Sequence, residues 1–402
     1  MHIVIANNIY PPIQAGGAEL IVAMLAERLV ERGHRVTVVS TCSPDAEPYP
    51  NEIRNGVEVI RFFPKNIYWH WERGNRKGYE KALWHLRDAW NADAGAKFSA
   101  IIAERNPDIL HTHLIDGMSA ILWRKARQMG VPVVHTAHDY HLLCPRALML
   151  TKSLKICTNP QLGCRIYRAW HTRTTKDIDV FCSPSQFLID KHIEAGISAK
   201  TTAVVRNGIV LPAITNPAIR RGDNEVTKFI FAARLTVEKG CEVLLAALKL
   251  LPPDLPFEIS IAGKGDYAEK FAELAAADRR VKYLGYIQSS EKDAAFRSSD
   301  WLIIPSLWYE NAPVVIVEAA AYGLGVIGSN IGAIPEFVAH EKTGLLFTAG
   351  SAQSLADSII RAVRDKEILQ NLEQYTKPFI ETSSVDNMVD SYLEQYNRII
   401  KK

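Results

Sequence analysis

The fold of this chain is most constrained by short, almost wholly apolar segments that alternate with longer segments of helical periodicity. Five such segments fall in the first half of the chain: HIVIA, RVTVVST, DILHTH, PVVHTAH and DVFCSPS. Five more follow in the second half: KFIFAAR, FEISIAG, VKYLG, WLIIPS and GVIGS. Strands without an exposed polar face are buried on both sides, as in a parallel sheet that helices cover. We therefore predict an α/β fold.

The chain has 402 residues, which is long enough for two or three domains. Between residues 210 and 227 the alternation lapses into VLPAITNPAIRRGDNEVT, whose Pro, Asn and charge are typical of a linker. We predict two Rossmann-like, doubly wound parallel-sheet domains, residues 1–208 and 209–380, that face a cleft. Residues 381–402 belong to no strand–helix unit and predict a separate amphipathic helix.

Charge and hydropathy exclude several classes of function. The net charge is +3 and no long basic block occurs, so nothing favours a nucleic-acid partner. No apolar run reaches the roughly 18 to 20 residues of a membrane span. Because MHIVIAN begins a strand at once, we expect no signal peptide and a cytoplasmic protein. Its six cysteines would then be reduced.

Ligands of doubly wound sheets bind at the carboxyl ends of the strands, so the loops there are the candidate sites. Gly16 and Gly17 follow the first strand, at the start of a helical segment. Backbone amides at a helix N-terminus attract anions, and glycine lets a ligand approach closely. The loop is not GxGxxG, which counts against a dinucleotide site. The alternative interpretation is a flexible turn with a capping glycine.

Two more loops of the second half carry residues suited to a phosphate ligand. Arg234 and Lys239 lie just beyond the strand KFIFAAR, where a guanidinium fork and an ammonium would suit a diphosphate. Gly263 and Gly265 follow FEISIAG and permit a tight turn near a planar or phosphate ligand. Two solvated charges and an ordinary strand-to-helix turn are the alternatives.

The segment ENAPVVIVEAAAYG places two carboxylates at the ends of an apolar run. Glu310 is predicted to lie in a loop and Glu318 about two turns later in a helix. A carboxylate within an apolar helix needs partners, and sugar or ribose hydroxyls are suitable donors. The alternatives are a cation that pairs with Glu318 and a capping role for Glu310. A two-carboxylate hydrolase is a further interpretation, which no second feature supports.

Together these segments resemble the retaining glycosyltransferases of family 4, which have the GT-B fold of two Rossmann-like domains. The resemblance covers nearly the whole chain, and the spacing of Glu310 and Glu318 is its most specific part. It rests on GGAE at 16–19, HTAHD at 135–139, RNG at 206–208, ARLTVEKG at 233–240, AGKGD at 262–266, PSLWYENAPVVIVEAAAYG at 305–323 and GAIPEFVAHEKTGLLF at 332–347. It implies that the C-terminal helix packs back on the N-terminal domain.

The resemblance also implies roles for residues of the second domain, which would bind the nucleotide-sugar donor. Arg234 and Lys239 would hold the diphosphate and stabilise it as the leaving group. Glu318 would accept hydrogen bonds from the ribose hydroxyls. Glu310 would contact hydroxyls of the donor sugar.

Further roles are implied for backbone groups and for the first, acceptor-side domain. The backbone amides of Asn311 and Ala312 would orient the donor sugar. Gly16 and Gly17 would approach the diphosphate when the domains close. His138, beside Asp139, would line the sugar pocket near the anomeric carbon; the alternative is a histidine satisfied at a strand end.

The chemistry that the resemblance implies is transfer with retention of anomeric configuration, by front-face attack. Arg234, Lys239 and the loop amides would stabilise the developing charge on the diphosphate, so that no metal ion is required. No DxD motif occurs, and we expect no cofactor. The donor would be a UDP- or GDP-sugar. The acceptor would be a glycan, a lipid-linked sugar or a small molecule, in the synthesis of a bacterial polysaccharide or glycoconjugate.

Other functions share this architecture. A nucleotide-sugar 2-epimerase would need titratable residues for acid–base work, which the Arg–Lys and Glu–Glu set does not suggest. A pyridoxal-dependent sugar phosphorylase would be longer. A non-catalytic two-lobed sugar-binding protein would usually be exported, and we expect no signal peptide.

Two features stand outside the resemblance. Cys144, Cys157 and Cys164 lie in one loop-like stretch without a CxxC pair, so both a structural zinc site and free, partly buried thiols stay open. Residues 61–105 carry many aromatics and more basic than acidic residues, a theme that Trp170 continues. This surface could rest on the inner face of the cell membrane; alternatively its aromatics pack on the sheet.

Overall fold

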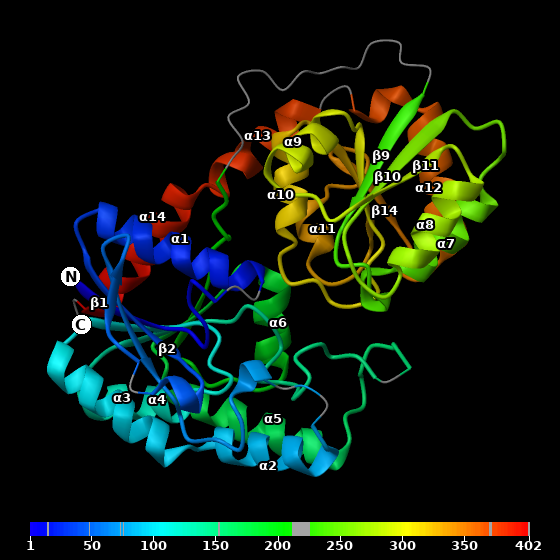
Figure 1. Cartoon of the computed structure of the whole chain (residues 1–402). Helices are drawn as coiled ribbons and strands as arrows, with labels where there is room; N and C mark the ends of the chain where they lie inside the picture. Colours follow the sequence, from blue (N-terminus) through cyan, green and yellow to red (C-terminus); the bar gives the residue numbers. More distant parts are fainter. Residues whose placement is uncertain are drawn as a thin grey trace. The chain divides into compact units, whose positions relative to one another are not determined.

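A computed structural model of the chain describes residues 1–13, 16–47, 49–72, 74, 76–151, 153–210, 226–369 and 372–400 (Figure 1). The chain divides into two compact units. The first contains Met1–Met149, Thr158–Gly208 and Val385–Lys402, and the second contains Leu150–Cys157 and Ile209–Ser384. Most of the predicted linker, residues 211–225, lies outside the described residues, as do Gln14 and Ala15 of the first glycine loop.

The first unit is built on a sheet with the strand order β3-β4-β2-β1-β5-β6-β7-β8. All neighbouring strands are parallel except β3 and β4, which are antiparallel. The strands are β1 (His2–Ala6), β2 (Arg35–Thr41), β3 (Glu52–Arg54), β4 (Val57–Phe62), β5 (Ile109–Thr112), β6 (Val133–Thr136), β7 (Val180–Ser183) and β8 (Thr201–Val204). The helices are α1 (Gly17–Glu31), α2 (Gly78–Ala89), α3 (Ala92–Arg105), α4 (Ile121–Gln128), α5 (Leu162–Thr174), α6 (Gln186–Glu194) and α14 (Val385–Ile400).

The second unit is built on a wholly parallel sheet with the strand order β11-β10-β9-β12-β13-β14. The strands are β9 (Thr227–Ala232), β10 (Phe257–Ala262), β11 (Val281–Gly285), β12 (Trp301–Ile304), β13 (Gly325–Ser329) and β14 (Gly344–Phe347). The helices are η4 (Val237–Lys239), α7 (Cys241–Leu250), α8 (Ala268–Ala277), α9 (Ser289–Arg297), α10 (Val314–Ala321), α11 (Ile334–Phe337), α12 (Ala352–Arg364) and α13 (Leu372–Thr382).

The strand order of each sheet confirms the predicted Rossmann-like folds. In the second sheet the chain runs outward from β9 to β11, returns to β12, and continues to β14 on the other side. In the first sheet the same reversal occurs between β1 and β5. A ligand site forms where the direction reverses, because the loops after the two central strands leave in opposite directions. The loops after β1, β5, β9 and β12 are therefore the candidate ligand sites.

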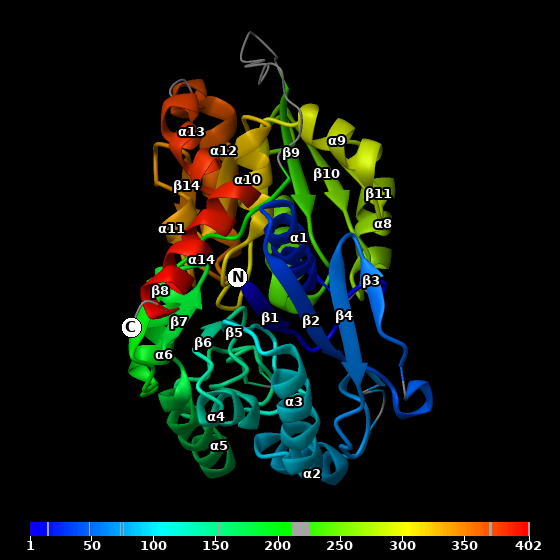
Figure 2. The same ribbon diagram turned by 90° about the vertical axis from the view of Figure 1, so that its left-hand side faces the viewer.

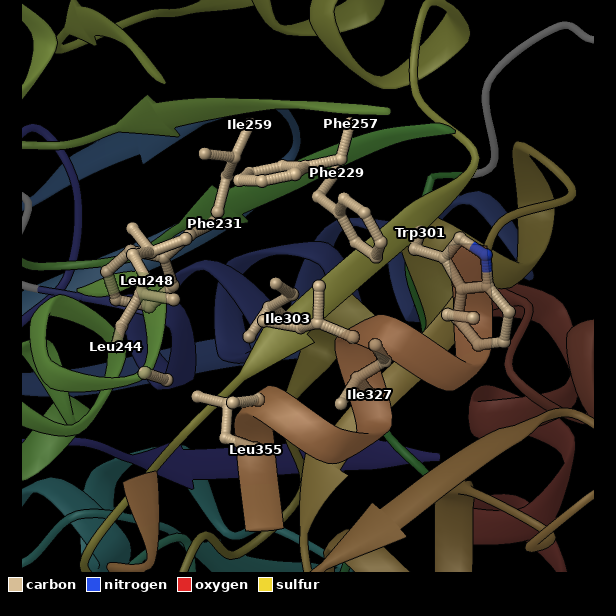
Figure 3. Packing of buried hydrophobic residues seen from close by; sticks show 14 of the residues in the cluster. Phe229, Phe231, Leu244, Leu248, Phe257, Ile259, Trp301, Ile303, Ile327 and Leu355 are labelled. Atoms are coloured by element: carbon tan, nitrogen blue, oxygen red, sulfur yellow. The ribbon is translucent and has the colours of Figure 1, made fainter. Parts of the chain in front are cut away.

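Each unit has its own apolar core. Figure 3 shows the core of the second unit, where Phe229, Phe231 and Trp301 of the sheet pack against helix residues such as Leu244 and Leu355. The core of the first unit includes Met388, Val389, Tyr392 and Tyr396 of α14. Helix α14 therefore packs on the first unit, as predicted.

Helices α1 and α14 lie side by side (Figures 1 and 2), and ion pairs also join them. Asp386 accepts from Arg28 at 2.7 Å and from Arg32 at 2.6 Å. These side chains are half-exposed, so the buried aromatic contacts contribute most of the attachment.

The structure adds four strands that the sequence analysis did not predict: β3, β4, β8 and β14. β3 and β4 form a hairpin across Asn55 and Gly56, which both have positive φ. An Asn-Gly pair is a strong hairpin signal. The two strands beside it contain charged residues, so they do not stand out as apolar runs. β8 is largely exposed and therefore does not appear as an apolar run. β14 is mostly buried; its residues GLLF lie within the quoted segment GAIPEFVAHEKTGLLF but were not assigned to a strand.

Candidate active site

Two loops of the second unit, those after β9 and β12, are joined by backbone contacts. The amide of Leu307 donates to the carbonyl of Glu238 at 2.9 Å. Gly240 has φ +79°, and a Cβ on it would lie 1.7 Å from the carbonyl oxygen of Pro305. Glycine at position 240 therefore allows the loop after β9 to lie directly on the loop after β12.

This contact brings Lys239 and Glu310 together. The Glu310 side chain is buried, and its Oε1 accepts from Lys239 Nζ at 2.7 Å, Ser306 Oγ at 2.6 Å and Trp308 Nε1 at 2.8 Å. Burial alone would raise the pKa of Glu310, but the Lys239 ammonium and the three donors hold that pKa below its usual value. Its second oxygen, Oε2, accepts no hydrogen bond from the described residues.

The loop after β13 supports the backbone of Glu310. Ala333 N donates to Glu310 O at 2.8 Å. Gly332 has φ +61°, and a Cβ there would lie 2.6 Å from Glu310 N. The sequence analysis quoted GAIPEFVAHEKTGLLF but gave it no role, and it missed Ser306 and Trp308 as partners of Glu310.

The predicted sugar-orienting residues follow Glu310 directly. Asn311 is buried and Ala312 is half-buried, in the loop before α10. The Ala312 amide donates to no acceptor within the described part of the chain.

Beside this loop the second unit has a pocket of about 510 Å³. It is lined by Ala232, Ala233, Arg234, Ala262, Gly263, Lys264, Tyr286, Ile287, Gln288, Lys292, Val315 and Glu318. The Arg234 side chain is 67% exposed and lies 3.6 Å from Glu238, which leaves it able to reach a ligand. Glu318 pairs with Lys292 at 2.6 Å. A cation does partner Glu318, as the alternative interpretation had it, and both charges remain on the pocket wall.

Gly263 and Gly265 lie in the loop after β10. Gly263 N donates to Gly285 O at 2.7 Å, and Leu235 N donates to Lys264 O at 2.9 Å. These bonds hold the loop against its neighbours on both sides, so the glycines serve backbone packing as well as the pocket wall.

In the first unit the predicted glycines lie at a helix N-terminus. Gly16 is the N-cap of α1 and Gly17 is its first residue. The Glu19 carboxylate lies close to Gly16, and burial raises the pKa of Glu19. An anion at this amide would therefore have to displace that carboxylate.

His138 follows β6 and is half-buried. Its Nε2 lies 2.9 Å from Nδ1 of His113, which follows the adjacent strand β5. Burial lowers the pKa of His138 to about 4, so the ring is neutral near pH 7. The sequence analysis quoted DILHTH without noticing His113, because only the strand order reveals that β5 and β6 are neighbours.

The structure thus groups the predicted residues by unit. In the second unit Lys239, Glu310 and Asn311 share one loop junction, and Arg234, Gly263 and Glu318 line the adjacent pocket. Gly16, Gly17 and His138 belong to the first unit. The cleft predicted between the domains stays a prediction.

The remaining sequence features are also located. The six cysteines, all within the described residues, form no disulfide; Cys144, Cys157 and Cys164 are half-buried. Within the described ranges, no group of three or more His, Cys, Asp and Glu side chains is arranged to hold a metal ion. Among the described helices, none has both the length and the apolar character that a bilayer crossing requires.

Comparison with known proteins decides the family. The profile of the "Glycosyltransferase Family 4" domain matches residues 15–211, and that of "Glycosyl transferases group 1" matches residues 215–379. A 42.6 kDa protein of unassigned activity from the cps region of Klebsiella pneumoniae is 31% identical over 341 residues, 84% of this chain and 87% of that protein. The chain belongs to the family 4 glycosyltransferases.

Other relatives support the same family assignment. The phosphatidyl-myo-inositol mannosyltransferase of Mycolicibacterium smegmatis is 26% identical over 88% of this chain and 82% of its own length. The solved structure of Anabaena Alr3699/HepE in complex with UDP superposes with a TM-score of 0.71 at 20% identity, covering 99% of this chain and all of that one. The predicted GT-B fold is confirmed. The enzyme is a retaining nucleotide-sugar glycosyltransferase, which sets aside the epimerase, phosphorylase, hydrolase and sugar-binding interpretations.

Proposed function

We propose that this glycosyltransferase moves a sugar from a UDP-sugar to a glycan or lipid-linked acceptor in the synthesis of a surface polysaccharide, without a metal ion. The donor part of this proposal rests on the Glu310 carboxylate, whose Oε1 accepts from three donors while its Oε2 accepts from none of the residues that the structure describes. An ionised, preorganised oxygen beside a pocket is a suitable acceptor for a sugar hydroxyl. The cps-region relative supports the polysaccharide, and the UDP complex of the Anabaena protein supports UDP over GDP.

The proposed roles of the pocket residues follow from their charges. Arg234 and Lys239 bind the diphosphate and stabilise it as the sugar–phosphate bond breaks. An ammonium has three donors, so Lys239 can keep Glu310 as a partner while it binds a phosphate oxygen. Glu318 accepts from the ribose hydroxyls, with Lys292 retaining one of its oxygens. These cations supply the charge that a metal ion would otherwise provide.

Calorimetric titration of UDP and GDP tests the donor site. We expect UDP to bind the wild type. Arg234→Ala and Lys239→Ala should each weaken it at least about tenfold, since hydrogen bonds between charged groups are worth about 1.5–3 kcal/mol. Lys282→Ala is the control, because Lys282 on β11 pairs with the half-exposed Glu258 on the neighbouring strand β10. Preferred binding of GDP would contradict the proposed nucleotide, and undiminished binding by both variants would contradict the proposed diphosphate contacts.

We infer that the acceptor is presented at a membrane surface, from an apolar face on α2 and α5. On α2, Tyr79, Leu83, Leu86 and Trp90 recur at helical spacing and are 62%, 50%, 73% and 42% exposed. Exposed apolar residues at this spacing form one stripe along a helix, and no described element covers it.

Helix α5 carries a second stripe of the same kind. Leu162, Ile166 and Trp170 are 70%, 63% and 46% exposed. The two stripes meet where the Trp90 and Trp170 rings lie edge to face at 6.0 Å. Tyr68, Trp69 and Trp84 of the same segment are buried, as the packing interpretation expects, whereas the exposed stripes support the membrane interpretation.

The charges beside the stripes favour an anionic bilayer as the occupant. Lys81 and Arg87 are exposed on α2, and Arg165 and Arg173 are exposed on α5, which contains no carboxylate. Tryptophan and tyrosine with leucine on the apolar side and cations beside them are typical of helices that lie in a membrane interface. We propose a peripheral location on the inner face of the cell membrane.

Flotation with vesicles tests this surface. We expect the full chain to float with vesicles that contain phosphatidylglycerol, and less at high salt. Leu86→Glu combined with Ile166→Glu should abolish flotation, whereas Ile53→Glu, at an 80% exposed site on β3, should not. Flotation of the double variant at the wild-type level would refute the membrane face. Loss of a wild-type dimer in the double variant, without any flotation, would identify a second copy of the chain as the partner instead.

A further inference from the structure

His113 and His138 form a hydrogen-bonded imidazole pair at the carboxyl ends of β5 and β6. Nδ1 of His113 lies 2.9 Å from Nε2 of His138, and the rings are nearly parallel, with 22° between their planes. His113 is buried, with 2% of its surface exposed. A bond between two such nitrogens requires one to carry the proton and the other to offer its lone pair.

The surroundings of His113 decide which nitrogen carries the proton. Its Nε2 has no hydrogen-bond partner within the described residues. If that nitrogen held the proton, a buried N–H would be left without an acceptor; if Nδ1 holds it, only a lone pair is left without a donor. Buried orphan N–H groups are the rarer and more costly of the two.

We propose that His113 is a positioning residue for His138: it donates from Nδ1–H to Nε2 of His138 and thereby fixes the proton of His138 on Nδ1. The inference rests on the proposed function, in which His138 lines the donor-sugar pocket. It requires both rings to be neutral, and burial lowers the pKa of His113 and of His138.

The consequence is a restricted role for His138. A neutral imidazole has one lone-pair nitrogen, and here that nitrogen is occupied by His113. His138 therefore cannot take a proton from the acceptor hydroxyl as a general base. Its one N–H, on Nδ1, makes it a hydrogen-bond donor and not a proton acceptor.

A third histidine, His111, packs against His113 and links the pair to α14. The His111 ring lies 4.0 Å from the His113 ring, centroid to centroid. His111 is itself fixed on both sides, by Tyr396 Oη at 2.6 Å from Nδ1 and Thr136 Oγ1 at 2.8 Å from Nε2. His113 therefore has little freedom to rotate, and the orientation of His138 depends in part on α14.

Isosteric substitutions of His113 test the assignment. In His113→Asn an amide N–H can replace Nδ1–H and keep His138 protonated on Nδ1. In His113→Asp a carboxylate takes the same place; it accepts a hydrogen bond and so moves the proton of His138 from Nδ1 to Nε2. Long-range ¹H–¹⁵N spectra of the histidine side chains in the full chain report the tautomer, with the His138 signals assigned by their loss in His138→Gln.

We expect His138 to carry its proton on Nδ1 in the wild type and in His113→Asn, and on Nε2 in His113→Asp. The kcat of His113→Asp should fall at least about tenfold below that of His113→Asn, with a smaller change in KM. Protonation of wild-type His138 on Nε2, or equal kcat in the two variants, would overturn the proposal. Full activity in His138→Gln would overturn the proposed role of His138 instead, and the spectra would still decide the tautomer.

Discussion

Three donors share one oxygen of Glu310, and this asymmetry leaves the other oxygen to a ligand. The buried carboxylate is stable in its charged form only because Lys239 and the two neutral donors compensate its lost hydration. The same partners hold the group in one orientation. An active-site acceptor that is already oriented and ionised needs no rearrangement when the transition state forms.

Glu310→Gln should therefore impair catalysis and lower stability, while the variant still folds. The amide must present a nitrogen either to its three donors or to the sugar hydroxyl, and we expect kcat/KM to fall about 100-fold or more. The lost pairing with Lys239 should lower the free energy of unfolding by about 3 kcal/mol at pH 7. Steady-state kinetics and urea unfolding measure the two effects, with Glu258→Gln on the exposed pair with Lys282 as control.

The pH dependence of this stability has a definite sign. Because the folded-state pKa of Glu310 is depressed, its ionisation contributes stability that is present above its usual pKa and is lost as the pH falls through the depressed value. The stability gap between wild type and Glu310→Gln should shrink as the pH is lowered from 6 to 3. A constant gap over that range would contradict the ion pair.

At the scale of elements, three loops meet at one backbone segment. The loops after β9, β12 and β13 contact one another through Gly240 with Pro305 and through Gly332 with Glu310. The orientation of Glu310 thus depends on a loop that contributes no side chain to the pocket.

Gly332→Ala should displace Glu310 and reduce kcat/KM at least about tenfold, since small errors in placement are costly in an active site. Gly350→Ala is a matched control. Gly350 also has positive φ, at +79°, but a Cβ there would meet only a Leu307 side-chain atom at 3.6 Å. Both variants should lose about 1 kcal/mol of stability through backbone strain, and only Gly332→Ala should lose activity. Equal kinetics in the two would show that the contact with Glu310 is unimportant.

The elements also show which features could be predicted from the sequence and which could not. β1, β2 and β13 begin and end where the apolar segments predict, because burial on both faces leaves a continuous apolar run. Glu310 was predicted to lie in a loop and to contact a sugar, but its partners Ser306 and Trp308, four and two residues away, could not be predicted, because they lie in an irregular loop that no periodicity describes. His113 is recognisable only once the sheet places β5 beside β6. The roles assigned to Arg234, Glu318 and the glycines remain predictions.

At the scale of the whole molecule, the attachment of α14 can be divided into two kinds of contact. Tyr392 is 1% exposed in the core of the first unit, and Tyr392→Ala should lower the free energy of unfolding of that unit by about 3–5 kcal/mol. Asp386→Ala removes the half-exposed pairs with Arg28 and Arg32 and should cost about 1 kcal/mol or less. Denaturant unfolding compares them, and a larger loss in Asp386→Ala would reverse this ranking.

The return of α14 also makes the second unit an insertion in the chain of the first. The chain leaves the first unit at Gly208 and re-enters it at Val385. These two passages lie side by side, since Ile209 N donates to Ser383 O at 2.9 Å. A recombination event that exchanged the second unit between relatives would need both junctions. A single crossover would place a foreign α14, with its own tyrosines, against the histidines of the original first unit.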